Sequence, residues 1–251
     1  MRLPVPPRIL AIAGSDSSGG AGIQADIKTI TMLGGYAMTA ITAVTAQNTL
    51  GVTAVEALSP EMVAAQIDAC LSDIGVDAVK IGMLGSPEIA HVVADRLGDL
   101  PVATVFDPVM VATSGAILAD EATVAAFERL MKLAALTTPN VPELEALGGR
   151  QAMAARGIAY LAKGGDAEGP RVEDALVRPG ESDRVWRSPR IATRHSHGTG
   201  CTLSSAIATL LGRGLPLEDA ILQAREFVRA AILAAPGFGA GHGPMGHQAV
   251  R

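Results

Sequence analysis

The chain has 251 residues, of which 49% are hydrophobic and 18% are charged, so it can build a large core and is not a disordered segment. Its 25 acidic and 20 basic residues give a net charge of −5, without any run of lysine and arginine. Proteins that bind nucleic acid are usually more basic, and 3% of aromatic residues is too few for a platform that stacks bases. Nucleic acid is therefore not expected as a partner.

Cysteine usage and hydropathy both favour the cytoplasm. The two cysteines, Cys70 and Cys201, cannot form a framework of disulfides, and a chain of this length does not need one. The first seven residues include three prolines and do not resemble a signal peptide. No window approaches the roughly 20 apolar residues of a membrane span. We therefore expect a cytoplasmic protein without a membrane partner.

Strand and helix patterns alternate in the first half of the chain. A strand is expected over 9–13, and β-rich runs follow over 39–46 and 52–55. Between them lies a helix whose apolar positions are Ile23, Ile27, Ile30 and Leu33. Ser59 can cap the next helix, with a predicted buried stripe of Met62, Val63, Ile67, Cys70, Leu71 and Ile74. A strand over 78–81 and a helix that begins at Ser86 complete this half.

The alternation continues to the end of the chain. A strand over 102–106, a helix capped by Asp120 and a strand over 136–138 are followed by a short helical piece beyond Gly148. Strands over 158–162, 172–177 and 184–186 then precede helices over 199–211 and 217–233. Because parallel strands need helical crossovers, this order predicts an α/β fold with a doubly wound, mostly parallel sheet and helices on both faces. Without a linker or a repeat, we expect one domain over 1–251.

Polar or glycine-rich residues follow most of the predicted strands. They lie over 14–16, 47–48, 82–83, 107–108 and 163–166, and at Asn140. Open parallel sheets bind ligands at the carboxyl ends of their strands. Any one of these segments could be only a turn, but together they predict a binding site at that edge.

The segment 14–22 is rich in glycine and serine and leads into a helix. Its glycines let a ligand approach the backbone, and the free amides at the helix start favour an anion or a polar group. It lacks the Gly-Lys-Ser/Thr ending of a P-loop and does not match the dinucleotide-binding pattern. Taken alone, it is equally well explained as a structural turn.

The stronger signal is His197-Gly198-Thr199-Gly200-Cys201 at the start of an amphipathic helix. Two glycines leave the amides of the first turn uncovered, and such a turn can hold the oxygens of a phosphoryl group in transfer. The position predicts a lowered pKa for the Cys201 thiol, whose thiolate could accept a proton from an attacking hydroxyl. The alternative is a buried structural cysteine, which is the better description of Cys70.

The sequence does not support zinc or acyl-transfer chemistry. There is no paired-cysteine spacing and no His-Glu-x-x-His pattern, and the histidines are scattered. His197 is expected to orient the glycine turn and not to bind a metal. A nucleophile elbow of the Gly-x-Ser-x-Gly type is absent as well.

Several motifs occur in one order along the chain. The longest is IAGSDSSGGAGIQADIKT over 12–29, and the others are TAVTAQNT over 42–49, KIGML over 80–84, DPVM over 107–110, TPN over 138–140, KGG over 163–165 and HGTGC over 197–201. They are spread from residue 12 to residue 201, and the resemblance that they carry extends over almost the whole chain. In these motifs the sequence resembles the hydroxymethylpyrimidine/phosphomethylpyrimidine kinases of thiamine biosynthesis, which belong to the ribokinase-like superfamily.

The resemblance implies ATP-dependent phosphorylation of 4-amino-5-hydroxymethyl-2-methylpyrimidine and then of its monophosphate. It assigns the aminopyrimidine edge to Gln47, with Asp26 nearby and with Gly14, Met83 and Val109 around the ring. A glutamine side chain offers both a donor and an acceptor, which suits a ring nitrogen beside an exocyclic amine.

The resemblance also implies how the phosphates are held. Lys163 would lie near the phosphates of ATP, Gly198 and Gly200 would supply an anion hole, and Cys201 occupies the position of the Asp base of sugar kinases. The segment 237–243 would approach the adenine. The Asn-x-x-Glu element made by Asn140 and Glu143 would hold Mg²⁺ through water. Relatives are commonly homodimers, so a homodimer is expected.

Three departures from the family pattern affect the phosphate side. Asp166 stands where a histidine often follows Lys-Gly-Gly, and Thr113 stands where a lysine often precedes Ser-Gly. The segment 147–158 is short, which implies a truncated or lost surface helix. Two alternatives stay open: a pyridoxal kinase, which residues 46–48 disfavour, and a weakly catalytic pyrimidine sensor, which the intact turn over 197–201 disfavours.

Overall fold

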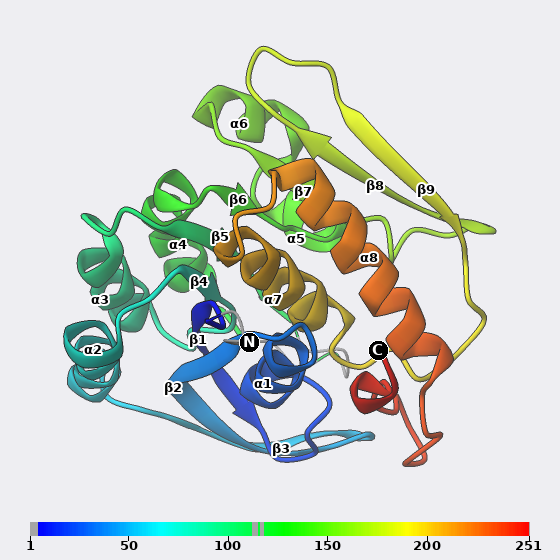
Figure 1. The fold of residues 1–251 in the computed structure, drawn as a ribbon, viewed down its shortest axis with the longest axis horizontal. Coiled ribbons are helices and arrows are strands. Elements are labelled where there is room, and N and C mark those ends of the chain that lie inside the picture. Colours follow the sequence, from blue (N-terminus) through cyan, green and yellow to red (C-terminus); the bar gives the residue numbers. More distant parts are fainter. Residues whose placement is uncertain (1–4, 112–114, 116–117, 251) are drawn as a thin grey trace.

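The computed structural model describes residues 5–111, 115 and 118–250, and within them a nine-stranded sheet forms the middle layer (Figure 1). The strand order is β3-β2-β1-β4-β5-β6-β7-β8-β9. The strands are β1 (Arg8–Asp16), β2 (Tyr36–Asn48), β3 (Gly51–Ala57), β4 (Ala78–Ile81), β5 (Ala103–Phe106), β6 (Leu136–Thr137), β7 (Tyr160–Ala162), β8 (Arg171–Val177) and β9 (Arg184–Pro189).

The middle of the sheet is parallel and both edges are antiparallel. β1 pairs in parallel with β2 and β4, and parallel pairing continues through β5 and β6 to β7. β3 runs antiparallel to β2, and β8 and β9 form an antiparallel ribbon beside β7. The prediction of a mostly parallel sheet is confirmed, so the carboxyl ends of the central strands lie along one edge.

Helices cover both faces of the sheet, as the alternating patterns predict. They are α1 (Gly22–Met32), α2 (Pro60–Ala69), α3 (Pro87–Leu97), α4 (Glu121–Leu133), α5 (Val141–Ala146), α6 (Gly149–Arg156), α7 (Thr199–Gly212) and α8 (Leu217–Leu233), with a π-helix over Cys70–Ile74 and a 3-10 turn over His247–Ala249. α1, α7 and α8 pack on one face, and α2, α3 and α4 pack on the other (Figure 1).

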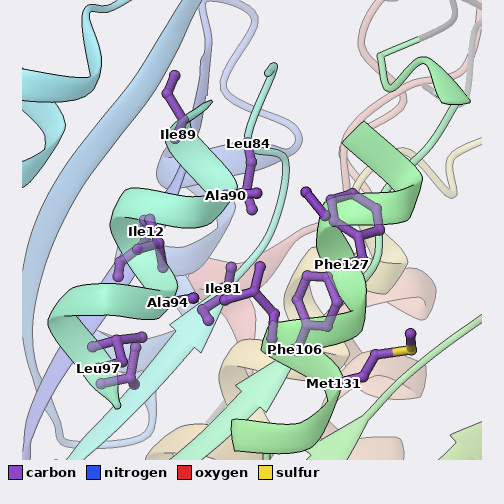
Figure 2. Close-up of a cluster of buried hydrophobic side chains, with 14 of the residues drawn as sticks. Ile12, Ile81, Leu84, Ile89, Ala90, Ala94, Leu97, Phe106, Phe127 and Met131 are labelled. Carbon is purple, nitrogen blue, oxygen red and sulfur yellow. The ribbon is translucent and has the colours of Figure 1, made fainter. Parts of the chain in front are cut away.

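Alternate residues of β1 belong to different cores. Leu10 and Ile12 join the cluster under α2, α3 and α4, whereas Ile9 and its neighbours at alternate positions pack under α1, α7 and α8. Figure 2 shows part of the first cluster, where Phe106 of β5 meets Phe127 of α4 edge to face, with ring centroids 5.1 Å apart. The central strands are thus buried on both faces, which fixes the positions of the residues that follow them.

The predicted helix starts agree with the structure. Ser59, Ser86 and Asp120 each accept a hydrogen bond from the backbone N–H three residues further on. One helix is missing from the sequence prediction, because α5 has only six residues and no apolar periodicity. Its signal is a capping box in which Asn140 and Glu143 each bind the backbone of the other.

Three apolar side chains expected in buried stripes are exposed instead. Ile27 is 40%, Met62 is 52% and Ile74 is 39% exposed. α1 buries Asp26 and Thr29, so the face that packs on α7 is partly polar and Ile27 is turned away from it. At the end of α2 the π-helix changes the periodicity, which moves Ile74 off the stripe.

Two further expectations concern segment boundaries. β1 continues to Asp16 instead of ending at residue 13, with a change of register at Gly14. The short segment 147–158 holds the eight-residue helix α6, so a helix is not lost there. Thr113 lies outside the described residues. Within the described ranges, every helix is too short or too polar to traverse a lipid bilayer.

Candidate active site

A cavity of about 1020 Å³ lies at the edge of the sheet where the central parallel strands end. Segments that follow β1, β2, β4, β5, β6 and β7 line it together with the start of α7. The predicted site residues among its lining are Gly14, Gln47, Met83, Val109, Asn140, Glu143, Lys163, Gly198, Gly200 and Cys201. Residues from both halves of the sequence therefore meet in one cavity.

The two glycine-rich loops dock on each other through Asp16 and His197. His197 Nε2 lies 2.8 Å from Asp16 Oδ2, and both residues are buried. Asp16 also accepts hydrogen bonds from the backbone N–H groups of Ser18, Gly20 and Ala21. Burial opposes the charge on Asp16, but these hydrogen bonds, with that of His197 foremost, lower its pKa. Because Asp16 is the acceptor, His197 donates from Nε2 and holds the start of α7 in place.

Glycine is required where these loops touch. Gly198 has a φ of 85°, in the left-handed region, and a Cβ atom there would clash with the carbonyl oxygen of Gly20. A Cβ atom on Gly20 would in turn clash with the ring of His197. On the cavity side, a Cβ atom on Gly200 would lie 3.4 Å from Lys163 Nζ. The first turn of α7 therefore presents uncovered backbone amides beside the Lys163 cation, and an anion can bind there.

Cys201 lies in this first turn, half-buried and on the cavity wall. Burial raises the pKa of its thiol to about 11, and Asp26 and Asp107 act in the same direction, against Lys80 and a hydrogen bond from the backbone of Gly22. The prediction of a lowered pKa is therefore wrong. The loss of hydration disfavours the thiolate more than the helix N-terminus favours it, so the resting side chain is a neutral thiol.

Lys163 is held as a permanent cation by two carboxylates. Its Nζ donates to Asp107 Oδ1 at 2.7 Å and lies 3.7 Å from Glu143 Oε2. Burial opposes the charge, but attraction to Asp107 and Glu143 raises the pKa of Lys163 above its ordinary value. Asp107 also accepts a hydrogen bond from Thr138 Oγ1 at 3.1 Å. The sequence marks Asp107 only as a residue after a strand, and its contact with Lys163 requires the fold.

Asn140 and Glu143 form the start of α5 at the cavity wall. Asn140 N–H donates to Glu143 Oε2 at 2.8 Å, and Glu143 N–H donates to Asn140 Oδ1 at 2.9 Å. Burial raises the pKa of Glu143 to about 7, against the attraction of Lys163. Among the described residues, Glu143 Oε1 takes no hydrogen bond, and no cluster of three or more His, Cys, Asp or Glu side chains could enclose a metal ion.

Gln47 lies on the cavity wall near the end of β2. Its Oε1 is 3.1 Å from Thr45 Oγ1, and its Nε2 is 3.3 Å from His197 Nε2. The backbone of Gln47 exchanges two hydrogen bonds of 2.8 Å with Ser17 Oγ. A Cβ atom on Gly14 would lie only 2.9 Å from Met83 Sδ, so the absence of a side chain at Gly14 leaves room for Met83 on the cavity wall.

Asp26 does not line the cavity, which corrects its predicted place beside the ring. It is fully buried, and both of its oxygens accept from Lys80 Nζ at 2.9 Å. The segment 237–243, which the resemblance assigns to the adenine, lies near Thr49. A Cβ atom on Gly239 or Gly241 would clash with Thr49, so this segment packs beside the end of β2. His242 from this segment lines the cavity.

Comparison with known proteins agrees with these features. The model of the phosphomethylpyrimidine kinase family matches residues 16–246. A hydroxymethylpyrimidine/phosphomethylpyrimidine kinase of Rhizobium meliloti is 48% identical over 257 positions, which cover 95% of this chain and 96% of that protein. The thiamine biosynthesis bifunctional protein ThiED of Geobacter sulfurreducens is 46% identical, and the match covers 95% of this chain and 52% of that protein.

A solved structure provides the comparison of folds. The ADP complex of Bacillus subtilis pyridoxal kinase superposes with a TM-score of 0.88 at 33% sequence identity, covering 98% of this chain and 99% of that one. The expected ribokinase-like fold is thereby confirmed.

Proposed function

The chain belongs to the phosphomethylpyrimidine kinase family, and from this premise we propose that it transfers the γ-phosphoryl group of ATP to 4-amino-5-hydroxymethyl-2-methylpyrimidine and then to the monophosphate. It is a phosphotransferase, and its family name and its relatives favour the pyrimidine over pyridoxal as acceptor. One observation carries the proposal. A single cavity brings Gln47 together with Lys163 and the glycine turn of α7.

The part of the cavity near Gln47 suits the pyrimidine ring. The amide of Gln47 offers a donor and an acceptor to a ring nitrogen and its neighbouring amine. Gly14, Met83 and Val109 supply mostly apolar wall around that amide.

The part of the cavity formed by Lys163 and the first turn of α7 suits a phosphoryl group in transfer. Gly198 and Gly200 leave the amides of the first turn uncovered, and Lys163 adds a fixed positive charge beside them. Phosphoryl transfer needs positioning and charge neutralisation more than covalent help from the protein. These groups supply both.

Cys201 is the proposed proton acceptor. The substrate oxygen forms the new bond to the γ-phosphorus, the bond to the bridging oxygen of ATP breaks, and the hydroxyl proton passes to the Cys201 thiolate. Since the resting thiol is neutral, only the deprotonated fraction is competent, and the rate of transfer depends on that fraction.

The donor set near α5 fits a hydrated Mg²⁺ ion. Mg²⁺ keeps several waters and usually takes only one or two protein carboxylates beside the substrate phosphates. Glu143 has one carboxylate oxygen, Oε1, without a partner among the described residues, and Asn140 holds the other oxygen in place. Glu143 and Asn140 would hold the ion through water. When bound, the ion would neutralise part of the charge of the phosphates.

ATP as the phosphoryl donor is supported by the ADP complex of the related kinase. We also propose that the chain works as one domain over 1–251 in a cytoplasmic homodimer. Support for this comes from the family resemblance and from two free cysteines, Cys70 and Cys201, which suit a reducing compartment.

The test measures ATP consumption with Mg²⁺ and three acceptors, namely the hydroxymethylpyrimidine, its monophosphate and pyridoxal, with products identified by mass. Turnover of both pyrimidines is expected. Turnover of pyridoxal alone would contradict the proposal, and so would tight binding of the pyrimidine without turnover, which would indicate a sensor. Gln47→Ala should weaken pyrimidine binding by about tenfold or more, because a buried hydrogen-bonding pair is lost. Asn48→Ala, the exposed neighbour, is the matched control.

A further inference from the structure

A fully buried ion pair lies behind the cavity wall, where none of the proposed steps uses it. Lys80 of β4 and Asp26 of α1 are both 0% exposed, and Lys80 Nζ is 2.9 Å from each oxygen of Asp26. Ser205 of α7 donates to Asp26 Oδ1 at 2.7 Å. Neither charged residue lines the cavity, so the pair does not touch a substrate there.

The packing of α1 against α7 places this pair directly beneath Cys201. Residues four apart on a helix lie on one face, about one turn of ~5.4 Å apart. On α7 these are Cys201 and Ser205, and on α1 they are Gly22 and Asp26. Ser205 donates to Asp26, so the Asp26 carboxylate lies about one turn of α7 from Cys201. The same two helices therefore hold the thiol at one level and the ion pair one turn deeper.

Stability alone does not account for the pair. A buried ion pair loses so much hydration that well-packed apolar side chains of similar size often stabilise a protein as well or better. Apolar residues pack on this side of the sheet as well, with Ala13, Ile23 and Ala206 each at most 3% exposed. The location under the cavity offers a second role, which is electrostatic.

We propose that Lys80 is a positioning residue, whose buried ammonium group, fixed by Asp26, favours the thiolate of Cys201 during proton transfer. The inference rests on the proposed function, in which Cys201 accepts the hydroxyl proton. The S–H bond forms as the O–H bond of the substrate breaks, and Lys80 keeps its own proton throughout. Attraction to Asp26 outweighs burial and raises the pKa of Lys80, so its charge is permanent.

Four charged groups act on Cys201 from the elements around it. They are Lys80 from β4, Asp26 from α1, Asp107 after β5 and Lys163 after β7. After burial, Lys80 has the largest effect on the thiol, and it favours the thiolate, whereas Asp26 and Asp107 oppose it.

The test measures the pKa of Cys201 without any substrate, from the pH dependence of its alkylation by iodoacetamide in a Cys70→Ser background. Lys80→Met should raise this pKa by about one unit or more and slow alkylation at pH 8 about tenfold. Asp26→Asn, which keeps the shape of the side chain, should shift the pKa in the opposite direction. A purely structural ion pair predicts no such reversal, so shifts of the same sign would overturn the proposal.

A double variant, Asp26→Asn with Lys80→Met, guards against misfolding because it leaves no lone buried charge. It should alkylate more slowly than the wild-type chain, and an unchanged pKa would contradict the role of Lys80. Lys132→Met, at an exposed lysine of α4, is the control and should shift nothing. In turnover assays Lys80→Met should lower kcat and leave the KM for the pyrimidine unchanged. Since alkylation needs no substrate, it tests the inference even if the acceptor proves to be another molecule.

Discussion

Cys201 is subject to two opposing influences. The start of α7 favours a thiolate, but the fold that brings the turn together also removes the sulfur from water, and burial is the stronger effect. Sequence position alone predicts the wrong direction of the shift, because the desolvation of a side chain depends on what packs over it. The site therefore combines a poorly ionised thiol, the proposed proton acceptor, with a permanently charged Lys163.

The pH dependence of turnover follows from this. Because the acceptor must be deprotonated and its pKa is raised to about 11, kcat should rise with pH between 7 and 10 in the wild-type chain. Cys201→Ala should lose most turnover and keep pyrimidine binding. Cys201→Asp should flatten the rise, since a carboxylate is already ionised at neutral pH. Steady-state rates across this range check the prediction, and full activity of Cys201→Ala would remove the thiol from the mechanism.

At the scale of elements, the site depends on the docking of two loops at the starts of α1 and α7. Asp16 and His197 supply the polar contact, and Gly20 and Gly198 allow the close approach. The family motif contains all four residues, but only the fold brings residues 16–20 next to residues 197–198. Local patterns predict the two loops separately and say nothing of their contact.

Gly198→Ala should disrupt this docking. The added methyl group meets a left-handed backbone and the carbonyl oxygen of Gly20, so we expect a loss of stability of more than about 1–3 kcal/mol and a loss of turnover. Gly214→Ala is a matched control, since it has the same φ of 85° with open space around it. Denaturant unfolding of both variants separates backbone strain from the clash. Equal losses would show that the contact between the loops contributes little.

A second element, the 3-10 turn near the end of the chain, is tied to α7 by a histidine. Thr202 Oγ1 lies 2.8 Å from His247 Nε2, and His247 is only 1% exposed. Burial lowers the pKa of His247 to about 4, aided by Lys28. The buried imidazole therefore stays neutral at pH values where an exposed histidine takes up a proton.

Stability should consequently fall as the pH is lowered from about 6.5 to about 4. In that window the unfolded chain binds a proton at His247 and the folded chain does not, which favours unfolding by up to about 3 kcal/mol. His247→Gln, which retains a hydrogen-bonding group for Thr202, should reduce this dependence. His91→Gln on the exposed surface of α3 should not. Urea unfolding at pH 7 and at pH 5 measures the change in the free energy of unfolding with pH. An equal change for wild type and His247→Gln would contradict the prediction.

Much of the element pattern is predictable from the sequence. The caps at Ser59, Ser86 and Asp120 and the helices that follow them need only local signals. Burial on α1 is not predictable in this way, because Asp26 is drawn inward by Lys80 from a distant strand while Ile27 faces outward. The place of Asp26 behind the cavity has the same cause. Long-range ion pairs leave no periodic signal.

At the scale of the whole molecule, strand order explains why the cavity takes residues from both halves of the chain. The parallel strands from β2 to β7 end at one edge, so Gln47 and Lys163 contribute to a single site although 116 positions separate them. The family motifs predict that these residues share a function, and the sheet supplies the reason. Ligand binding should therefore stabilise the whole sheet and not only the strands from one half of the chain.

Thermal unfolding tests this coupling. A ligand at 100 times its Kd adds about 2.7 kcal/mol to the stability of the folded state, which for a chain of this size raises Tm by roughly 5–10 °C. The pyrimidine and a non-hydrolysable ATP analogue with Mg²⁺ should each shift one cooperative transition. At the same pyrimidine concentration Gln47→Ala, with binding weakened about tenfold, should lose about half of the shift caused by the pyrimidine and keep that caused by the nucleotide. Two separate transitions would argue against a single unit.

The contact between α7 and the segment after α8 also bears on synthesis at the ribosome. The backbone N–H of His197 donates to the carbonyl oxygen of Gly243, and that of Gly246 donates to Ala231. The chain emerges from its N-terminus, so β1 and its neighbours can pair long before this clasp exists. In a nascent chain the strands of the sheet therefore leave the ribosome before the residues that hold the turn over 197–201 in place.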